Sequence, residues 1–240
     1  MTNEPKILLA CPVSVYKDYI LYKWIDSVRT ELEGNFDILL VDNSSNIQHF
    51  RKLKSMGINV IHTKPYVNEK LNETLSRCMN IILKYALDNN YSHLFSLECD
   101  IFPPADIIET LLNHNKQVVS AAYNIGTPFY RTLMLQVPFV TGEDTFDVKT
   151  VSPKEAFEAI TGQLIKVYGC GLGCTLIQTE ILKDYQFRTD PNLTVHSDTF
   201  FHIDLYNRGF ESWLDTSVFC QHHNSSWSEI LRKHARKQRF

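Results

Sequence analysis

The chain has 240 residues, of which 44% are hydrophobic and 21% are charged, and its formal net charge is −3. This composition is typical of a globular protein with one substantial core, and it excludes collagen-like, low-complexity and disordered classes. No apolar run approaches the ~20 residues that a membrane-spanning helix needs. No Gly/Ser-rich or Pro-rich linker divides the chain either, so we expect one domain over residues 1–240.

The N-terminus and the cysteines bear on the cellular compartment. The opening segment, MTNEPKILLACPVS, lacks a basic stretch followed by a long apolar run, so it does not resemble a secretory signal. The six cysteines are dispersed in mostly apolar segments, as reduced thiols are. We therefore expect a cytoplasmic protein.

Charge is unevenly distributed along the chain. The last ten residues, LRKHARKQRF, carry five basic and no acidic side chains, which leaves the rest of the chain acidic. An acidic body argues against nucleic-acid binding over a large surface. The basic tail, residues 224–240, is most simply a solvated helix end, and a weak contact with an acidic acceptor or a membrane surface is the alternative.

The first half of the chain alternates strand-like and helix-like segments. Short apolar runs with polar or proline boundaries predict buried strands, and apolar residues with helical spacing predict helices. This alternation predicts an α/β fold with a parallel, doubly wound sheet. We expect strands at 6–12, 36–42, 58–62, 92–97 and 117–123, and helices at 16–32, 47–57, 69–88 and 104–113.

The second half is less regular. Residues 125–151 read as loops and short strands, and the run GCGLGCTLI predicts a glycine-rich turn that continues into a strand. We expect a short helix at 179–185, a longer one at 196–209 and a strand at 211–219.

Polar side chains stand where several predicted strands end. Cys11 and Pro12 end the first strand, Asp42 ends the second, and Glu98 and Asp100 follow the fourth. Ligands bind at the carboxyl ends of the strands in sheets of this kind. The sequence therefore predicts a ligand site at this edge.

Glu98 and Asp100 are separated by one residue, so strand alternation places them on the same side. Two carboxylates held this close repel each other unless a proton or a cation lies between them. Hard divalent cations such as Mg2+ and Mn2+ prefer oxygen ligands and often bridge to phosphates. The pair indicates a metal site, with two solvated acids at a loop as the alternative.

Two further residues strengthen the metal interpretation. His222 follows the last predicted strand, and neutral imidazole is a good ligand for a transition-type divalent cation. The adjacent His223 leaves this assignment open by one residue. Asp198 lies at the start of a predicted helix, where an acid either caps free amides or presents a carboxylate.

In their order and spacing, these segments resemble the GT-A glycosyltransferases, particularly the family-2-like branch of nucleotide-diphospho-sugar transferases. The resemblance covers nearly the whole chain and includes a DxD-type metal motif, in which Glu98 stands where the family usually has Asp. It implies a GT-A fold with a nucleotide-binding half (1–122) and an acceptor and catalytic half (123–223). The matching segments are ILLACPVS, ILLVDNSS, LSRCMNIILKYAL, LFSLECDIFPP, GCGLGCTLI and SDTFFHIDLYNRGFESWLDTSVFCQH.

The resemblance implies a metal-dependent, inverting transfer of a sugar from a nucleoside diphosphate, UDP-sugar by default, with Mn2+ or Mg2+ as cofactor. A cation neutralises the departing diphosphate, and a carboxylate accepts the proton of the attacking hydroxyl. By resemblance, Asp198 is this base, and Asp100 and His222 bind the metal. The implied donor-side residues are Cys11, Pro12, Asp42 (to the base), Arg77 (near the nucleotide), Glu98 (to the ribose or metal waters) and Asp100. The implied acceptor- and sugar-side residues are Tyr123, Gly171 and Gly173.

The acceptor is open at this point. A glycan, a lipid-linked sugar, a protein, a small molecule and a modified nucleobase are all compatible with the chemistry. The irregular segment 124–151 is expected to carry acceptor specificity, since such segments beside a fixed scaffold usually do. Tyr123, Phe129 and Tyr130 either stack on a sugar or base or pack in the core.

Other interpretations compete with this one. A nucleotidyltransferase would show a glycine-rich, basic loop after the first strand, but CPVSVYKDY has no glycine and one lysine. A non-catalytic nucleotide- or sugar-binding module is a second alternative. Cys170 and Cys174 with His222 and His223 would suggest structural zinc, although no second cysteine pair is nearby. Arg77 is alternatively a surface residue, and Asp42 alternatively caps a turn.

Overall fold

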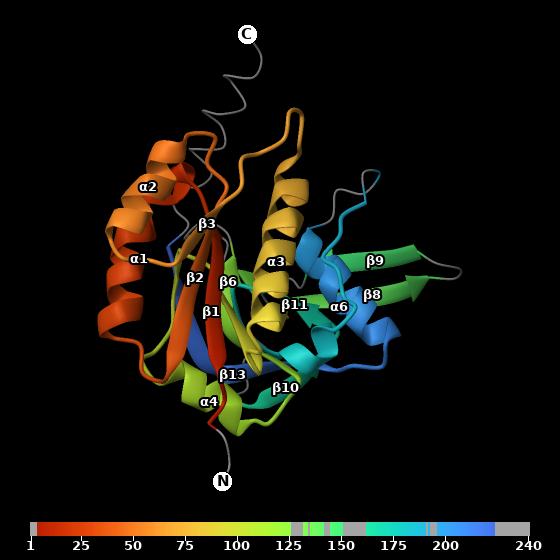
Figure 1. The fold of residues 1–240 in the computed structure, drawn as a ribbon. Helices are drawn as coiled ribbons and strands as arrows, with labels where there is room; N and C mark the ends of the chain where they lie inside the picture. Colours follow the sequence, from red (N-terminus) through yellow and green to blue (C-terminus); the bar gives the residue numbers. More distant parts are fainter. Residues whose placement is uncertain are drawn as a thin grey trace.

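A computed structural model describes residues 4–125, 132–133, 135–141, 145–150, 162–190, 192 and 196–223. The first seven regular elements are β1 (Ile7–Val13), α1 (Asp18–Thr30), β2 (Phe36–Asp42), α2 (Ile47–Ser55), β3 (Val60–His62), α3 (Leu71–Asp88) and β4 (His93–Leu97). The four strands lie side by side in the order β3-β2-β1-β4 and are parallel (Figure 1). Each element expected before residue 98 is present, with bounds within two residues of those predicted.

Helices cover both faces of this sheet, so β1 is buried from two sides. Ile7 and Leu9 pack in one core layer with α1, α2 and α4 (Ile107–Asn113). Leu8 packs in the opposite layer with α3 and α6 (Ser197–Asn207). Figure 1 shows α1 and α2 on one side of the sheet and α3 on the other. Each fully buried large apolar side chain stabilises the fold by roughly 1.5–3 kcal/mol, so these layers hold the sheet edge rigidly.

The second half departs from the expected parallel order. The fifth expected strand, β6 (Val118–Ile125), does not pair with β4, because β12 (Cys174–Gln178) lies between them and is antiparallel to both. Beyond β6 come β13 (Ser212–His222), parallel to it, and β10 (Leu164–Val167), antiparallel to β13. The sheet is therefore mixed, although most of its strands run in one direction. The local pattern cannot reveal this insertion, because β12 comes much later in the chain than the strands it separates.

The reversed direction of β12 matters for the site. Its first residue, Cys174, pairs with Leu97 at the carboxyl end of β4. The glycine turn, residues 171–173, comes directly before Cys174 and therefore lies at the same edge. The short strand β5 (Ile101–Phe102) pairs with the end of β13, where Ile101 lies opposite His222. Two distant segments are thus brought next to the residues that follow β4.

The remaining elements are short. A 3-10 helix at Val15–Lys17 follows β1, and another at Thr179–Leu182 replaces the short helix expected at 179–185. A small sheet combines β11 (Gly169–Cys170), β8 (Leu135–Thr141) and β9 (Thr145–Thr150), while β7 (Thr132–Leu133) pairs with β6. Among the described residues, no helix has the length and hydropathy needed to cross a bilayer.

Candidate active site

A cavity of about 180 Å³ opens at the carboxyl edge of the parallel strands. Its lining combines an apolar wall from α3 with carboxylates, a lysine and a histidine. The lining residues are Cys11, Pro12, Val13, Ser14, Lys17, Asn43, Leu71, Leu75, Met79, Ser96, Glu98, Cys99, Asp100, Leu172, His196, Ser197 and Asp198. The structure thus brings together Cys11, Pro12, Glu98, Asp100 and Asp198, as expected from the sequence.

Glu98 and Asp100 come together in a turn and not by strand alternation. β4 ends at Leu97, and the amide of Ile101 donates to the carbonyl of Glu98 at 2.9 Å, which closes a turn. The amide of Glu98 donates to the carbonyl of Gly173 at 2.8 Å, so the glycine turn holds this segment in place. The expected proximity of the two acids is found, but its geometric reason differs from the predicted one.

Glu98, Asp100 and His222 form a cluster that fits a divalent cation. Each offers one ligand atom, and these atoms lie within 4.8 Å of one another. Asp100 is only 1% exposed, and its Oδ1 accepts no hydrogen bond from the described part of the chain. A buried carboxylate oxygen without a partner is costly. Two carboxylates and an imidazole suit Mn2+ or a similar cation, so the residues present fit the metal that the resemblance implies.

The cluster distinguishes His222 from His223. His222 places its Nε2 3.7 Å from Oδ2 of Asp100, and its ring packs edge-on against Tyr123. His223 instead packs its ring against Phe102, and only its backbone amide reaches Asp100, donating to the carbonyl at 2.8 Å. His222 is therefore the candidate ligand.

Lys17 is a member of the site that the sequence analysis did not select. It lies in the 3-10 helix directly after β1, and its Nζ forms an ion pair with Oδ2 of Asp100. Burial would raise the pKa of Asp100, but His222 and Lys17 lower it further than burial raises it. Burial and the charge of Asp100 raise the pKa of Glu98. A lone lysine after a strand carries little signal, and only the fold shows that it faces the acids.

Asp198 also lines the cavity, from the first turn of α6, and is 6% exposed. Its Oδ2 accepts a hydrogen bond from the amide of Leu172 at 3.1 Å, so the carboxylate is held by the glycine turn. No side-chain cap bond is formed at the start of α6, where the N-cap residue is His196. The capping interpretation of Asp198 therefore has no support in this geometry.

His196 is the second residue that the sequence analysis missed. Its Nδ1 lies 3.1 Å from Oδ1 of Asp198, and the charge of Asp198 raises the pKa of His196 to about 9. Burial alone would raise the pKa of Asp198, but the His196 charge lowers it. The motif His-x-Asp at a helix start was visible in the sequence, but nothing in it distinguishes a partner histidine from a surface one.

The expected sugar-side residues frame the cavity without lining it. Tyr123 is buried, and its hydroxyl accepts a hydrogen bond from the amide of Gly173 at 3.1 Å. A Cβ at Gly173 would clash with Ile101 and lie 2.8 Å from the Tyr123 hydroxyl, so only glycine fits. Gly171 and Gly173 flank Leu172, which reaches the cavity. Tyr123 thus positions the glycine turn, and stacking on a ligand is not supported.

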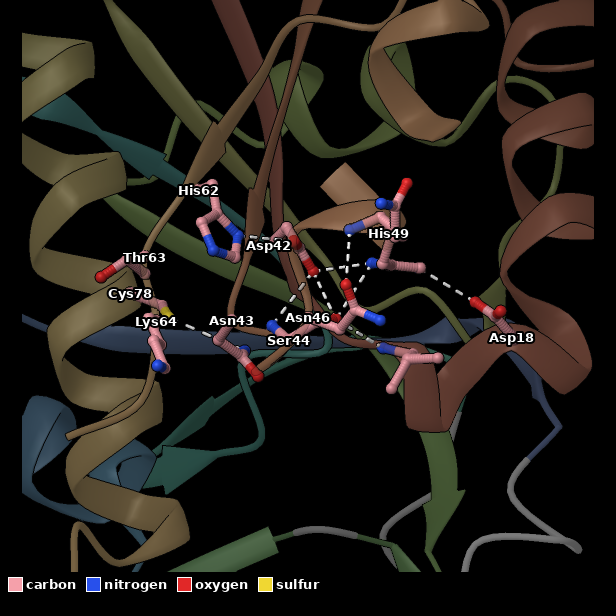
Figure 2. A network of polar contacts seen from close by, with 12 residues as sticks. Asp18, Asp42, Asn43, Ser44, Asn46, His49, His62, Thr63, Lys64 and Cys78 are labelled. Carbon is pink, nitrogen blue, oxygen red and sulfur yellow. Dashed lines mark hydrogen bonds and ion pairs between the residues drawn. The ribbon is translucent and has the colours of Figure 1, made fainter. Parts of the chain in front are cut away.

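Asp42 does not line the cavity, because neighbouring side chains enclose its carboxylate (Figure 2). His49 Nδ1 lies 2.7 Å from Oδ1, and His62 Nδ1 lies 2.8 Å from Oδ2. Ser44 donates to Oδ1 from its hydroxyl at 2.6 Å. The next residue, Asn43, faces the cavity instead. The expected contact between Asp42 and a nucleotide base is therefore not supported.

The Asp42 network extends to α1 through His49, whose Nε2 lies 2.9 Å from Oδ1 of Asp18. Both ring nitrogens thus face carboxylates, which only the doubly protonated imidazole satisfies as a donor. Burial would lower the pKa of His49, but Asp42 and Asp18 raise it. Burial would raise the pKa of Asp42, but His49, Ser44 and His62 lower it.

We expect Asp42→Ala to lower the free energy of unfolding by about 3–5 kcal/mol. It leaves the buried His49 and the partly buried His62 without the carboxylate that they share. Because the fold lowers the pKa of Asp42, this group stabilises the fold above pH 3.8, its ordinary pKa. Because the fold raises the pKa of His49, that group stabilises the fold below pH 6.5, its ordinary pKa. The difference from wild type is therefore largest between these values and shrinks outside them. Urea unfolding at pH 4, 6 and 9 measures it, with Asp37→Ala on the same strand as the control. A loss under 1 kcal/mol at pH 6 would contradict the network's role.

Arg77 also lies away from the cavity. Its guanidinium binds Glu69 through two contacts of 2.8 Å and donates to Thr63, so it fastens the segment between β3 and α3. Leu71, Leu75 and Met79 form the face of α3 that reaches the cavity. The expected place of Arg77 beside a nucleotide is not supported, and its role is to anchor this loop.

Several predictions lie outside the described residues: Phe129, Tyr130, most of the segment 124–151 and the basic tail 224–240. The residues of the zinc interpretation, in contrast, belong to the described part of the chain. Among the described residues, the metal-capable cluster contains neither Cys170 nor Cys174, which are both buried.

Comparisons with known proteins place the fold. No known protein-family profile matches the sequence, and no curated protein matches it. The chain superposes on a crystal structure of GalNAc-T7 with UDP, GalNAc and Mn2+ at a TM-score of 0.63 and 11% identity, over 92% of this chain and 44% of that one. It superposes on S. aureus TarS 1–349 in complex with UDP-GlcNAc at a TM-score of 0.53 and 13% identity, over 91% of this chain and 59% of that one. The chain therefore has the expected GT-A fold.

Proposed function

We propose that this chain is a cation-dependent, inverting glycosyltransferase that moves a sugar from a nucleoside diphosphate, by default UDP, to a hydroxyl of its acceptor. One observation carries the proposal: the buried Asp100, whose Oδ1 has no partner among the described residues, lies beside two further candidate ligands and shares a cavity with the carboxylate of Asp198. The presence of UDP with Mn2+ and of UDP-GlcNAc in the two structures of the same fold supports the donor class.

Glu98, Asp100 and His222 would hold Mn2+ or Mg2+. When bound, the cation neutralises the charge that develops on the departing diphosphate. The protein contributes a preorganised cluster around the buried Asp100, in which the turn after β4 and the end of β13 fix the three side chains.

The nucleoside part of the donor would occupy the apolar wall of the cavity. Leu71 and Met79 supply contact area on α3, and Cys11 and Pro12 close the other side. We assign the polar contact with the base to Asn43, since Asp42 is enclosed by histidines. An amide offers both a donor and an acceptor to a base edge.

Asp198 would accept the proton of the attacking hydroxyl. A general base must be ionised and within hydrogen-bond reach of the proton it removes. The lowered pKa of Asp198 keeps it ionised at neutral pH, and the Leu172 amide fixes its orientation. The glycine turn that carries Leu172 would border the transferred sugar. A base on the far side of the sugar from the diphosphate implies in-line displacement with inversion.

His196→Asn is expected to move the acidic limb of the kcat/KM profile upward by about 1 pH unit or more, because an adjacent cation lowers a carboxylate pKa by at least that much. The imidazolium of His196 lowers the pKa of Asp198. Without it the base is protonated at a higher pH, so activity is lost earlier as the pH falls. Donor hydrolysis measured between pH 4 and 9 tests this. An unchanged acidic limb would show that His196 does not tune the pKa of the base.

The direct test of the proposed function is turnover. UDP-, GDP-, CDP- and dTDP-sugars are incubated with the protein in Mn2+ and again in EDTA, and the released nucleoside diphosphate is quantified. We expect metal-dependent release from one donor class. Release of pyrophosphate from a nucleoside triphosphate would indicate a nucleotidyltransferase, and the absence of any turnover despite nucleotide binding would indicate a binding module.

A further inference from the structure

A lysine is part of the acidic cluster. Lys17 forms an ion pair with Oδ2 of Asp100, one of the carboxylates of the metal-capable group. The side chain of Lys17 is 18% exposed, and that of Asp100 is 1% exposed. The lysine reaches this acid from the end of β1, across 83 residues of sequence.

The ion pair has an electrostatic reason. Glu98 and Asp100 are held close together in a turn in which Asp100 is buried and Glu98 is partly buried. A buried carboxylate without a neighbouring cation is strongly unfavourable. The Lys17 ammonium supplies the balancing charge. The ammonium contacts Oδ2, and Oδ1 of the same carboxylate has no partner among the described residues. A divalent cation bound to Asp100 therefore brings further positive charge next to the ammonium, and their repulsion favours displacement of the lysine.

The Lys17 ammonium has a second anionic partner within reach when it leaves Asp100. It lines the same cavity as Glu98 and Asp100, beside which the donor diphosphate would lie. A lysine side chain is a compact charge on a flexible four-carbon stem, so it can reorient without movement of the backbone. An ammonium that leaves Asp100 would still find an anionic partner in a bound diphosphate.

We propose that Lys17 is an internal counter-ion that competes with the divalent cation for Asp100 and binds the diphosphate once the cation is in place. The second half of this proposal rests on the proposed function, and the first half rests on the cluster alone. The consequence is coupled binding: the cation alone binds weakly, and cation and nucleotide strengthen each other's binding by the same factor.

The test is a titration of Mn2+ into the whole chain without nucleotide, followed by electron paramagnetic resonance of free Mn2+. We expect Lys17→Met to bind Mn2+ about tenfold tighter than wild type, and Lys17→Arg, which keeps the charge, to bind it no tighter. Lys84→Met removes an exposed lysine that pairs with Asp88 on α3 and serves as the matched control. Thermal unfolding of each variant verifies that the fold is intact.

A second titration, of UDP at saturating Mn2+, separates the two proposals. We expect Lys17→Met to bind UDP about tenfold more weakly than wild type, so that the coupling between cation and nucleotide falls. Tighter Mn2+ binding in Lys17→Met, with no binding of UDP, GDP, CDP or dTDP by wild type, would support the competition and contradict the proposed function. Unchanged Mn2+ binding in Lys17→Met with normal UDP binding by wild type would overturn the inference and leave the proposed function in place.

Discussion

Asp198→Asn is expected to lower sugar transfer by about 10²- to 10⁴-fold, the contribution typical of a positioned general base. The amide keeps an oxygen that can accept the Leu172 hydrogen bond, so the glycine turn should stay in place. The substitution removes the negative charge and the basicity, and with the charge it removes the ion pair with His196. Binding of UDP with Mn2+ should therefore remain close to that of wild type.

The matched control is Asp204→Asn, on the same helix. Asp204 pairs with Arg188 and does not line the cavity. Its substitution should leave transfer within a few-fold of wild type. If Asp198→Asn retained most of its activity, or if its loss came entirely from weaker donor binding, Asp198 would not be the base.

Asp100→Asn is expected to remove most of the metal-dependent nucleotide binding. Residues outside the first coordination shell of a metal already change affinity about 10- to 100-fold, and a direct carboxylate ligand contributes more. The amide also weakens the ion pair with Lys17 and leaves Glu98 as the remaining acid of the cluster. We therefore expect UDP affinity in Mn2+ to fall about 100-fold or more, to the level of wild type in EDTA.

Asp37→Asn provides the control for Asp100→Asn. Asp37 accepts a hydrogen bond from the Tyr91 hydroxyl near the start of β2, at the opposite end of the strand from the cavity. Its substitution should not affect the response to Mn2+. Undiminished UDP binding by Asp100→Asn in Mn2+ would show that the cluster does not hold the cation.

Local pattern was enough to predict the first half of the fold. The strands around Leu9 and Leu40 are continuous apolar runs buried on both faces, and such runs clearly predict buried strands. The order of the later strands was not predictable. The buried run at 117–123 looks like a fifth parallel strand, and only long-range pairing with β12 shows that it is not a neighbour of β4.

The site was predictable where chemistry and strand ends coincide, as at Asp100. It was not predictable where a distant partner decides the role of a side chain. Asp42 is enclosed by His49 and His62, and Arg77 by Glu69, and these contacts are set by tertiary packing. Lys17 was missed because its role also depends on a distant partner, an acid 83 residues away.

The most direct test of the central claim is calorimetric titration of UDP, GDP, CDP and dTDP into the wild-type chain, each in Mn2+ and again in EDTA. The account predicts that one diphosphate binds in Mn2+ and that EDTA abolishes this binding. If no diphosphate binds in the presence of the cation, the cluster of Glu98, Asp100 and His222 does not serve a nucleotide-sugar donor, and the proposed function is contradicted.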